Sequence, residues 1–251
     1  MSGQNSAGGN MDGNILELRN LEKRFGGLMV FSGINLQVKK GEIYGIIGTN
    51  GSGKTTIFNI VCGMLKPEQG TVMYDGENIT GLPPWQIARK GIGRCFQLVM
   101  PFQSMTPLEN VRVARATAGQ YSDYKLFSVD EIMEITGLKD KRDVPTSELS
   151  LPDKKNVEIA RALACNPKLV LFDEVSCGLS GEEIGVRMKL MKDLAGKGVT
   201  IVVIEHIMMF IKEICDRVAV LHAGEVIMEG KPAEVAREKS VIDAYLGGRS
   251  M

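Results

Sequence analysis

The sequence is poor in histidine and aromatic residues, has no net charge and contains no long apolar run. Of its 251 residues, 2 are histidine and 1 is tryptophan, and 30 Lys+Arg balance 30 Asp+Glu. A balanced charge lacks the basic surface of a general nucleic-acid binder, so we expect no nucleic acid among its partners. Because no segment approaches the ~20 apolar residues that cross a bilayer, any attachment to a membrane is expected to go through another protein.

The five cysteines show no CxxC motif and no paired spacing, and only two histidines could join them as metal ligands. This pattern indicates reduced cysteines that pack inside a cytosolic protein. The residues concerned are Cys62, Cys95, Cys165, Cys177 and Cys215, with His206 and His222.

Composition and length favour a globular α/β protein. Hydrophobic residues make up 44% of the chain and charged residues 24%, and there are 29 glycines. These values exclude a disordered chain, a collagen and a coiled coil. Residues 1–13 have neither the basic flank nor the apolar run of a signal peptide, and we expect them to form a flexible tail. Residues 14–251 are expected to form the folded domain.

Strand and helix patterns alternate along the chain, which predicts a parallel sheet with crossover helices. The expected strands are 15–19, 33–38, 42–48, 71–74, 94–97, 169–173, 200–204, 217–221 and 225–228. The expected helices are 53–64, 108–116, 129–135, 152–164, 182–195 and one begun by Pro232. A turn at 75–78 indicates a small antiparallel sheet. The region of about 98–160 indicates an inserted helical subdomain, with a loose stretch at 118–124.

Residues 48–55 match the phosphate-loop pattern GxxxxGK[ST] between an apolar strand and a helix. Glycines in such a loop turn backbone N–H groups inward toward an anion, and the helix that follows adds its positive end. Lys54 can then bridge the β- and γ-phosphates of ATP, and the Thr55 hydroxyl can bind Mg²⁺. A glycine-rich turn without function is disfavoured because eight residues match in the correct context. The residues expected to bind nucleotide here are Gly48, Thr49, Asn50, Gly51, Ser52, Gly53, Lys54, Thr55 and Thr56.

Two carboxylates end the apolar strand expected at 169–173. Asp173 is placed to hold Mg²⁺ through water, and Glu174 to orient or deprotonate the attacking water, since phosphoryl transfer depends mainly on positioning and charge neutralisation. Alone, this segment could be a buried strand with a solvated acidic end. Together with Lys54 and Thr55 it predicts a catalytic site.

The order of these motifs resembles an ABC-type ATPase subunit over about residues 15–247. The likeness rests on the phosphate loop, on Gln97 after a strand, on residues 148–150 before IARAL, on the Asp-Glu pair and on Glu-His at 205–206. Segments at 23–27, 91–97, 101–111, 166–168 and 215–221 are similar to the ATP-binding subunits of branched-chain amino-acid importers. The resemblance implies a P-loop NTPase fold: a three-layer α/β sheet with an antiparallel β subdomain and an inserted helical subdomain.

The resemblance also implies roles for four more residues. Phe25 matches an aromatic that stacks on adenine, although alone it could be an edge-strand residue. Gln97 matches a glutamine that senses Mg²⁺ and water, although a Gln after a strand often only satisfies backbone groups. His206 matches a histidine that contacts the γ-phosphate. Ser150 belongs to the segment that completes the phosphate site of a second subunit.

An apolar groove for a helix of the permease could be lined by Met100, Phe102 and Met105, although methionines are as often core residues. His222 has no motif position and is expected in a surface turn.

Three features depart from the family pattern. The segment usually written Leu-Ser-Gly-Gly-Gln here has the sequence Leu149-Ser150-Leu151-Pro152-Asp153. The segment after the carboxylate pair is Cys177-Gly178-Leu179-Ser180, and the helical insertion is short for a branched-chain subunit. Pro152 offers no N–H, and Asp153 brings a carboxylate toward a polyanion or, alternatively, turns to solvent as a first-turn acid. We therefore hypothesise that this chain is an unequal partner in a heterodimer.

The sequence thus predicts an ATP-binding and hydrolysing subunit that powers a membrane transporter, with branched-chain or related amino acids as the expected cargo. Its cofactors are ATP and Mg²⁺. Its partners are a second ABC ATPase subunit, identical or related, and transmembrane permease subunits, which would hold it on the cytoplasmic face of the cell membrane. The alternatives are a soluble ABC ATPase not linked to transport and a monomeric P-loop NTPase.

Overall fold

The structure is a computed structural model that describes residues 13–117 and 127–246. Nearly all of the expected tail and the loose stretch expected at 118–124 lie outside these residues. Gly13, which we assigned to the tail, is already tied to the fold, because its carbonyl accepts a hydrogen bond of 2.9 Å from the Lys40 N–H. No helix in the described ranges is long and apolar enough to span a membrane.

A six-stranded sheet runs through the centre of the molecule in the order β10-β9-β3-β8-β7-β6. All neighbouring strands are parallel except β9 and β10, which form an antiparallel hairpin. Every residue of the three central strands is buried, which explains their near-continuous apolar sequences. The strands are β3 (Ile43–Gly48), β6 (Ile92–Cys95), β7 (Leu169–Asp173), β8 (Thr200–Ile204), β9 (Arg217–His222) and β10 (Glu225–Gly230).

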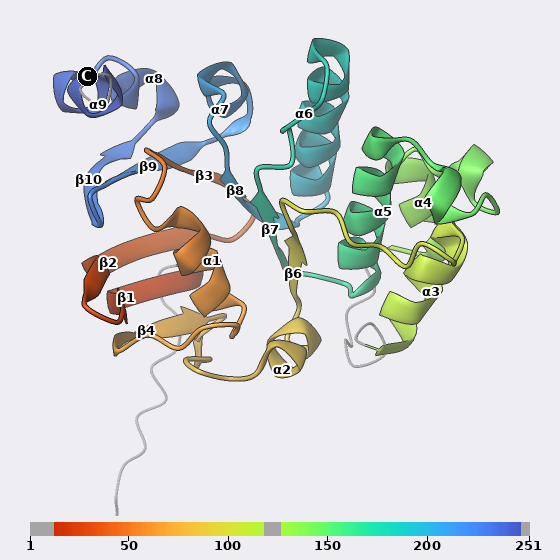
Figure 1. Ribbon diagram of the computed structural model, residues 1–251, viewed down its shortest axis with the longest axis horizontal. Coiled ribbons are helices and arrows are strands. Elements are labelled where there is room, and N and C mark those ends of the chain that lie inside the picture. The colour runs from red at the N-terminus through yellow and green to blue at the C-terminus, as the bar shows by residue number, and fades with distance from the viewer. Residues whose placement is uncertain (1–12, 118–126, 247–251) are drawn as a thin grey trace, which may run out of the picture.

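A second sheet is antiparallel and has the strand order β2-β1-β4-β5. Its strands are β1 (Asn14–Phe25), β2 (Leu28–Lys39), β4 (Gln69–Tyr74) and β5 (Glu77–Asn78). The helix α1 (Lys54–Val61) lies between the two sheets, and Ile57, Phe58 and Ile60 pack in a buried cluster shared by both (Figure 1). Residues 49–53 join the end of the central strand β3 to the start of α1.

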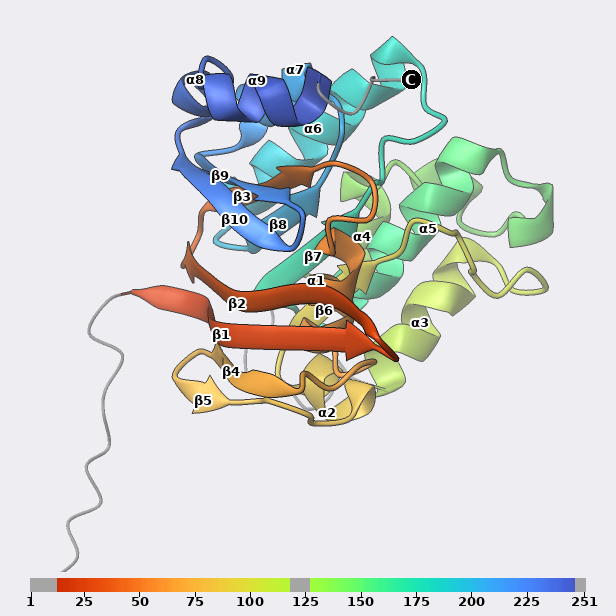
Figure 2. The same ribbon diagram turned by 60° about the vertical axis from the view of Figure 1, so that its left-hand side comes forward.

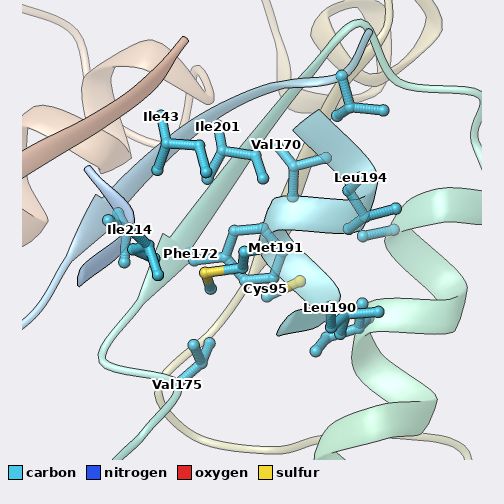
Figure 3. Close-up of a cluster of buried hydrophobic side chains, with 14 of the residues drawn as sticks. Ile43, Cys95, Val170, Phe172, Val175, Leu190, Met191, Leu194, Ile201 and Ile214 are labelled. Carbon is cyan, nitrogen blue, oxygen red and sulfur yellow. The ribbon is translucent and has the colours of Figure 1, made fainter. Parts of the chain in front are cut away.

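The helices α3 (Pro107–Thr117), α4 (Val129–Ile135) and α5 (Leu151–Ala164) form a group beside the β6 edge of the central sheet (Figures 1 and 2). Their positions agree closely with the helices predicted from sequence. On the face of the sheet opposite α1, α6 (Gly181–Gly196) and α7 (Met208–Ile214) cover the strands. Figure 3 shows this part of the core, where Phe172 and Val170 of β7 meet Met191 and Leu194 of α6.

Several predicted boundaries were wrong. The strand expected at 94–97 is β6, Ile92–Cys95, so Gln97 lies two residues beyond it. The strands expected at 15–19 and 33–38 extend to form a long hairpin around Gly26, which has φ +57°. Sequence reasoning did not identify α2 (Pro84–Arg89), α7 or α9 (Lys239–Leu246). The helix begun by Pro232 is the short α8 (Pro232–Val235).

Candidate functional site

The phosphate loop joins β3 to α1 and has room only for glycine at two positions. A Cβ atom on Gly48 would lie 2.1 Å from the Leu221 carbonyl oxygen. Gly53 has φ +100°, and a Cβ there would lie 2.8 Å from the Phe31 ring. Both glycines are therefore required by close approach of neighbouring strands as well as by the turn itself.

Two side chains of the loop are buried without a full set of partners. Lys54 is 5% exposed, and its Nζ donates to the carbonyls of Gly48 and Thr49 at 3.0 and 2.9 Å. Burial lowers the pKa of Lys54, while the charges of Glu174 and Asp173 oppose this shift. The Ser52 hydroxyl is buried and has no hydrogen-bond partner. A lysine and a hydroxyl poised in this way fit phosphate oxygens, which can take the place of the carbonyl acceptors.

A pair of oxygen donors lies next to the loop. The Thr55 hydroxyl is 3.5 Å from Asp173 Oδ1 at the end of β7. Asp173 is 2% exposed, and burial raises its pKa while a hydrogen bond and the charge of Arg94 act in the opposite direction. Hydroxyl and carboxylate oxygens are the donors that Mg²⁺ prefers, so this pair fits a magnesium ion held together with nucleotide phosphates.

The three side chains expected to be catalytic meet at one carboxylate. Gln97 Nε2 donates to Glu174 Oε2 at 2.6 Å, and His206 Nε2 lies 2.6 Å from Glu174 Oε1. Glu174 has φ +48°, a conformation that non-glycine residues rarely adopt. Its backbone N–H donates to the Ile204 carbonyl at 3.0 Å, which fixes this turn to the end of β8. Residues at the ends of β6 and β8 thus hold one acid beside the phosphate loop.

The loop, Gln97 and Glu174 line an open cavity of about 480 Å³. Its lining contains most of the predicted nucleotide ligands together with Gln97 and Glu174, and adds Val30 of β2, which we did not predict. The lining residues are Val30, Asn50, Gly51, Gly53, Lys54, Thr55, Thr56, Gln97 and Glu174.

Phe25 and Ser150 lie outside the lining of this cavity, as do Gly48, Thr49, Ser52, Asp173 and His206. Phe25 ends β1, is 48% exposed, and has the Lys23 ammonium 5.3 Å from its ring. Its exposure leaves the ring free to contact a flat apolar group. Ser150 is the N-cap of α5 and does not line this cavity.

The segment around Ser150 starts α5 with Pro152 and Asp153 in its first turn, as expected, but the expected turn of Asp153 to solvent is wrong. Asp153 is 9% exposed and does not turn to solvent, and its two oxygens each lie 2.7 Å from Lys141 Nζ. Ser150 Oγ donates to the same carboxylate at 2.5 Å and accepts from the Asp153 N–H at 3.3 Å. Burial acts to raise the pKa of Asp153, but the hydrogen bonds from Lys141 and Ser150 outweigh it and the pKa is lowered. The carboxylate charge is therefore compensated within the chain, which sequence reasoning missed.

The segment after Glu174 is held from two sides. Lys155 of α5 is buried, and its Nζ donates to the carbonyls of Val175, at 3.1 Å, and Cys177. Glu205, which precedes His206, accepts from the Ser176 N–H and hydroxyl at 2.9 and 2.5 Å. No sequence pattern predicted these contacts, because Lys155 stands in an ordinary amphipathic helix and Glu205 simply precedes His206.

A second cavity, of about 420 Å³, lies between α2, β6, α3 and α5 and is mainly apolar. Phe102 is part of its lining, but Met100 and Met105 are not. Met100 is 78% exposed nearby. His222 ends β9 beside the turn at Ala223, and its Nδ1 is buried without a hydrogen-bond partner, so it is less exposed than expected.

Comparisons with known proteins agree with this architecture. The family model of ABC transporters matches residues 31–176, and the model of the branched-chain amino acid ATP-binding cassette transporter matches residues 225–250. A high-affinity branched-chain amino acid transport ATP-binding protein, BraF of Pseudomonas aeruginosa, is 33% identical over 93% of this chain and 98% of its own.

The solved structures that share the fold include two ATP-binding cassettes. The ADP conformation of MJ1267, an ATP-binding cassette of an ABC transporter, has 31% identity and a TM-score of 0.83, covering 93% of this chain and 99% of that one. MJ0796, described as dimeric and bound to ADP and Pi, has 28% identity and a TM-score of 0.75, covering 87% and 99%. The chain belongs to the ABC transporter family and has the fold of its ATP-binding cassettes. Within that family it is similar to the ATP-binding subunits of branched-chain amino-acid importers.

Proposed function

We propose that this chain binds ATP with Mg²⁺ and hydrolyses it to drive a membrane transporter of branched-chain or related amino acids. The observation that carries the proposal is the clamp on Glu174, whose two oxygens are bonded to Gln97 and His206 beside the phosphate loop. Nucleotide-phosphate binding alone does not require an acid held in this way.

The residues divide the work as follows. The loop amides and Lys54 hold the β- and γ-phosphates, and Thr55 with Asp173 holds Mg²⁺, which when bound neutralises phosphate charge. Glu174 orients the attacking water and accepts its proton, and Gln97 and His206 position Glu174 by their bonds to its oxygens. Phe25 stacks on the adenine from the tip of the β1–β2 hairpin.

We infer that a second ATP-binding subunit completes the site. Ser150 caps α5 and does not line the phosphate-loop cavity, which fits a role toward the γ-phosphate held by a neighbouring subunit. The solved relative that is described as dimeric supports this arrangement. One chain then contributes two half-sites, and its place is against permease subunits on the cytoplasmic face of the membrane.

The transported substrate is inferred from the relatives. BraF is named for branched-chain amino acid transport, and the family model matching residues 225–250 carries the same description. None of the residues assigned above binds the cargo, so the proposal extends to related amino acids that the permease accepts.

The test uses the full chain expressed with its permease subunits in vesicles. Glu174→Gln should retain ATP binding and lose most ATP hydrolysis and amino-acid uptake, because the amide keeps the shape but cannot accept a proton. Glu225→Gln, an exposed acid of β10, is the matched control and should behave as wild type. Hydrolysis at the wild-type rate in Glu174→Gln would refute the catalytic assignment.

The two alternatives give different results in the same experiment. A soluble ABC switch would hydrolyse ATP but would not copurify with permease subunits or support uptake. A monomeric P-loop NTPase would show a specific activity independent of protein concentration and unaffected by loss of the Ser150 hydroxyl.

A further inference from the structure

Arg94 lies in β6 and reaches the acid expected to hold Mg²⁺. Its Nη2 donates to Asp173 Oδ2 at 2.9 Å, and the two side chains are 7% and 2% exposed. The strands pair so that Arg94 faces Leu171 in the neighbouring β7, two residues before Asp173. A charged residue in a short buried strand therefore has its counter-ion at the predicted active site.

The guanidinium is fixed on several sides. Its Nη1 donates to Asn59 Oδ1 of α1 at 2.6 Å, so one plane connects the phosphate-loop helix with the end of β7. The guanidinium carbon lies 4.5 Å from the centre of the Phe96 ring and 5.8 Å from that of Phe58. A flexible ammonium could not keep all of these contacts, because it lacks both the planar fork and the face that stacks on rings.

This arrangement gives the two oxygens of Asp173 different environments. Oδ2 is occupied by Arg94, whereas Oδ1 points to the Thr55 hydroxyl at 3.5 Å. Neither Arg94 nor Asp173 lines the phosphate-loop cavity, and Arg94 reaches the expected metal site through its bond to Asp173. Rotation of the carboxylate, which would bring Oδ2 toward Thr55, would break the bond to Arg94.

We propose that Arg94 is a positioning residue for the magnesium site: by holding Oδ2 it aims Oδ1 of Asp173 at the place where Thr55 and the metal meet. The proposal rests on the function proposed above. Some side chains hydrogen-bond a metal ligand on the side away from the metal. Their removal commonly changes metal affinity by about 10- to 100-fold. If Arg94 only stabilised the fold, its substitution would not change the Mg²⁺ affinity of the molecules that remain folded.

Arg94 also lines the apolar cavity between α2, β6, α3 and α5, together with Phe96 and Phe102. The same side chain therefore touches the wall of a surface groove and the acid of the metal site.

The experiment measures Mg²⁺ affinity of the full-length chain with an ATP analogue whose β,γ-bridge is an imido group and cannot be hydrolysed. Nucleotide binding is followed first in EDTA and then during a Mg²⁺ titration. Arg94→Met should bind the analogue in EDTA as wild type does, because it leaves the phosphate loop intact, and should need about tenfold more Mg²⁺. Arg94→Lys keeps the charge but not the fork, and should need several-fold more Mg²⁺.

Arg161→Met is the matched control. Arg161 also lines the apolar cavity and stacks on a ring, with its guanidinium carbon 4.8 Å from the centre of Phe102, but its salt bridge goes to Glu158. The Arg161→Met variant should bind Mg²⁺ with the same affinity as the wild-type chain.

The outcomes separate the inference from the function beneath it. If both Arg94 variants bind the analogue in EDTA and require the same Mg²⁺ as wild type, the inference is overturned and the proposed function stands. If Arg94→Met does not fold, Arg94→Lys decides on the same criterion. If the wild-type chain itself binds no nucleotide or shows no response to Mg²⁺, the proposed function fails.

Discussion

The bond between Lys141 and Asp153 leads to a prediction about the segment that contacts a second subunit. Lys141→Met removes the ammonium that lies 2.7 Å from both Asp153 oxygens but keeps the aliphatic stem. The Lys141 side chain is 46% exposed, so the pair contributes about 1 kcal/mol or less to the free energy of unfolding. The fold should therefore survive, with an uncompensated carboxylate beside Ser150.

The larger effect is expected on catalysis in the assembled transporter. If Asp153 lies ~8 Å from the γ-phosphate bound by a second subunit, an effective dielectric of ~20 gives a repulsion of about 2 kcal/mol. Screening at physiological ionic strength reduces this to about 1 kcal/mol. Lys141→Met should then lower ATP turnover about fivefold at the site that this segment completes.

A double-mutant cycle tests the electrostatic origin of this loss. Asp153→Asn in the Lys141→Met background removes the uncompensated charge and should restore most of the turnover. ATPase activity of the assembled transporter is measured for the four variants at low and high salt, and the defect of Lys141→Met should shrink as salt rises. An unchanged turnover in Lys141→Met, or a defect that Asp153→Asn does not relieve, would refute the reasoning.

Three further predictions concern single residues. Lys54→Ala should weaken ATP binding at least tenfold in equilibrium titrations, since only loop amides then face the phosphates; unchanged affinity would contradict the phosphate-loop assignment. Gly48→Ala should abolish ATP binding or folding, because its Cβ would lie 2.1 Å from the Leu221 carbonyl oxygen; wild-type binding would show that β9 can move away. Glu205→Ala should lower the free energy of unfolding in urea by about 2–4 kcal/mol, since it leaves two buried donors of Ser176 unpaired. A loss of stability no larger than that of Glu205→Gln would contradict this prediction.

Sequence patterns predicted the parts of the fold whose chemistry is local. The strands at 169–173 and 200–204 and the helix at 129–135 match the structure at both ends, because apolar runs and caps determine them. The capping box of α4, in which Ser128 and Glu131 exchange bonds, is encoded within four residues.

The elements that were missed depend on tertiary packing. The helix α7 has seven residues and no side-chain N-cap, and Phe210 and Ile211 are buried against the sheet. Nothing local distinguishes such a segment from a strand or loop, because its stability comes from the surface that it covers. The strand β6 was placed two residues too late. Phe96 has a high strand propensity, but only residues 92–95 find partners in β7.

Some residues of the site can likewise be recognised from a local motif, whereas others are brought to it only by the fold. A phosphate loop is contiguous, so its ligands could be named from eight residues. Arg94 and Asp173 are 79 positions apart, and Lys155 reaches a carbonyl 22 positions away. Both are cations that only the fold brings to buried acceptors, and in a single sequence each looks like a solvated charge. An unpaired charge in the protein interior costs free energy. A buried cation therefore lies next to an acceptor whose position the fold determines. In this chain those acceptors, the Asp173 carboxylate and the carbonyls after Glu174, lie next to the proposed catalytic acid.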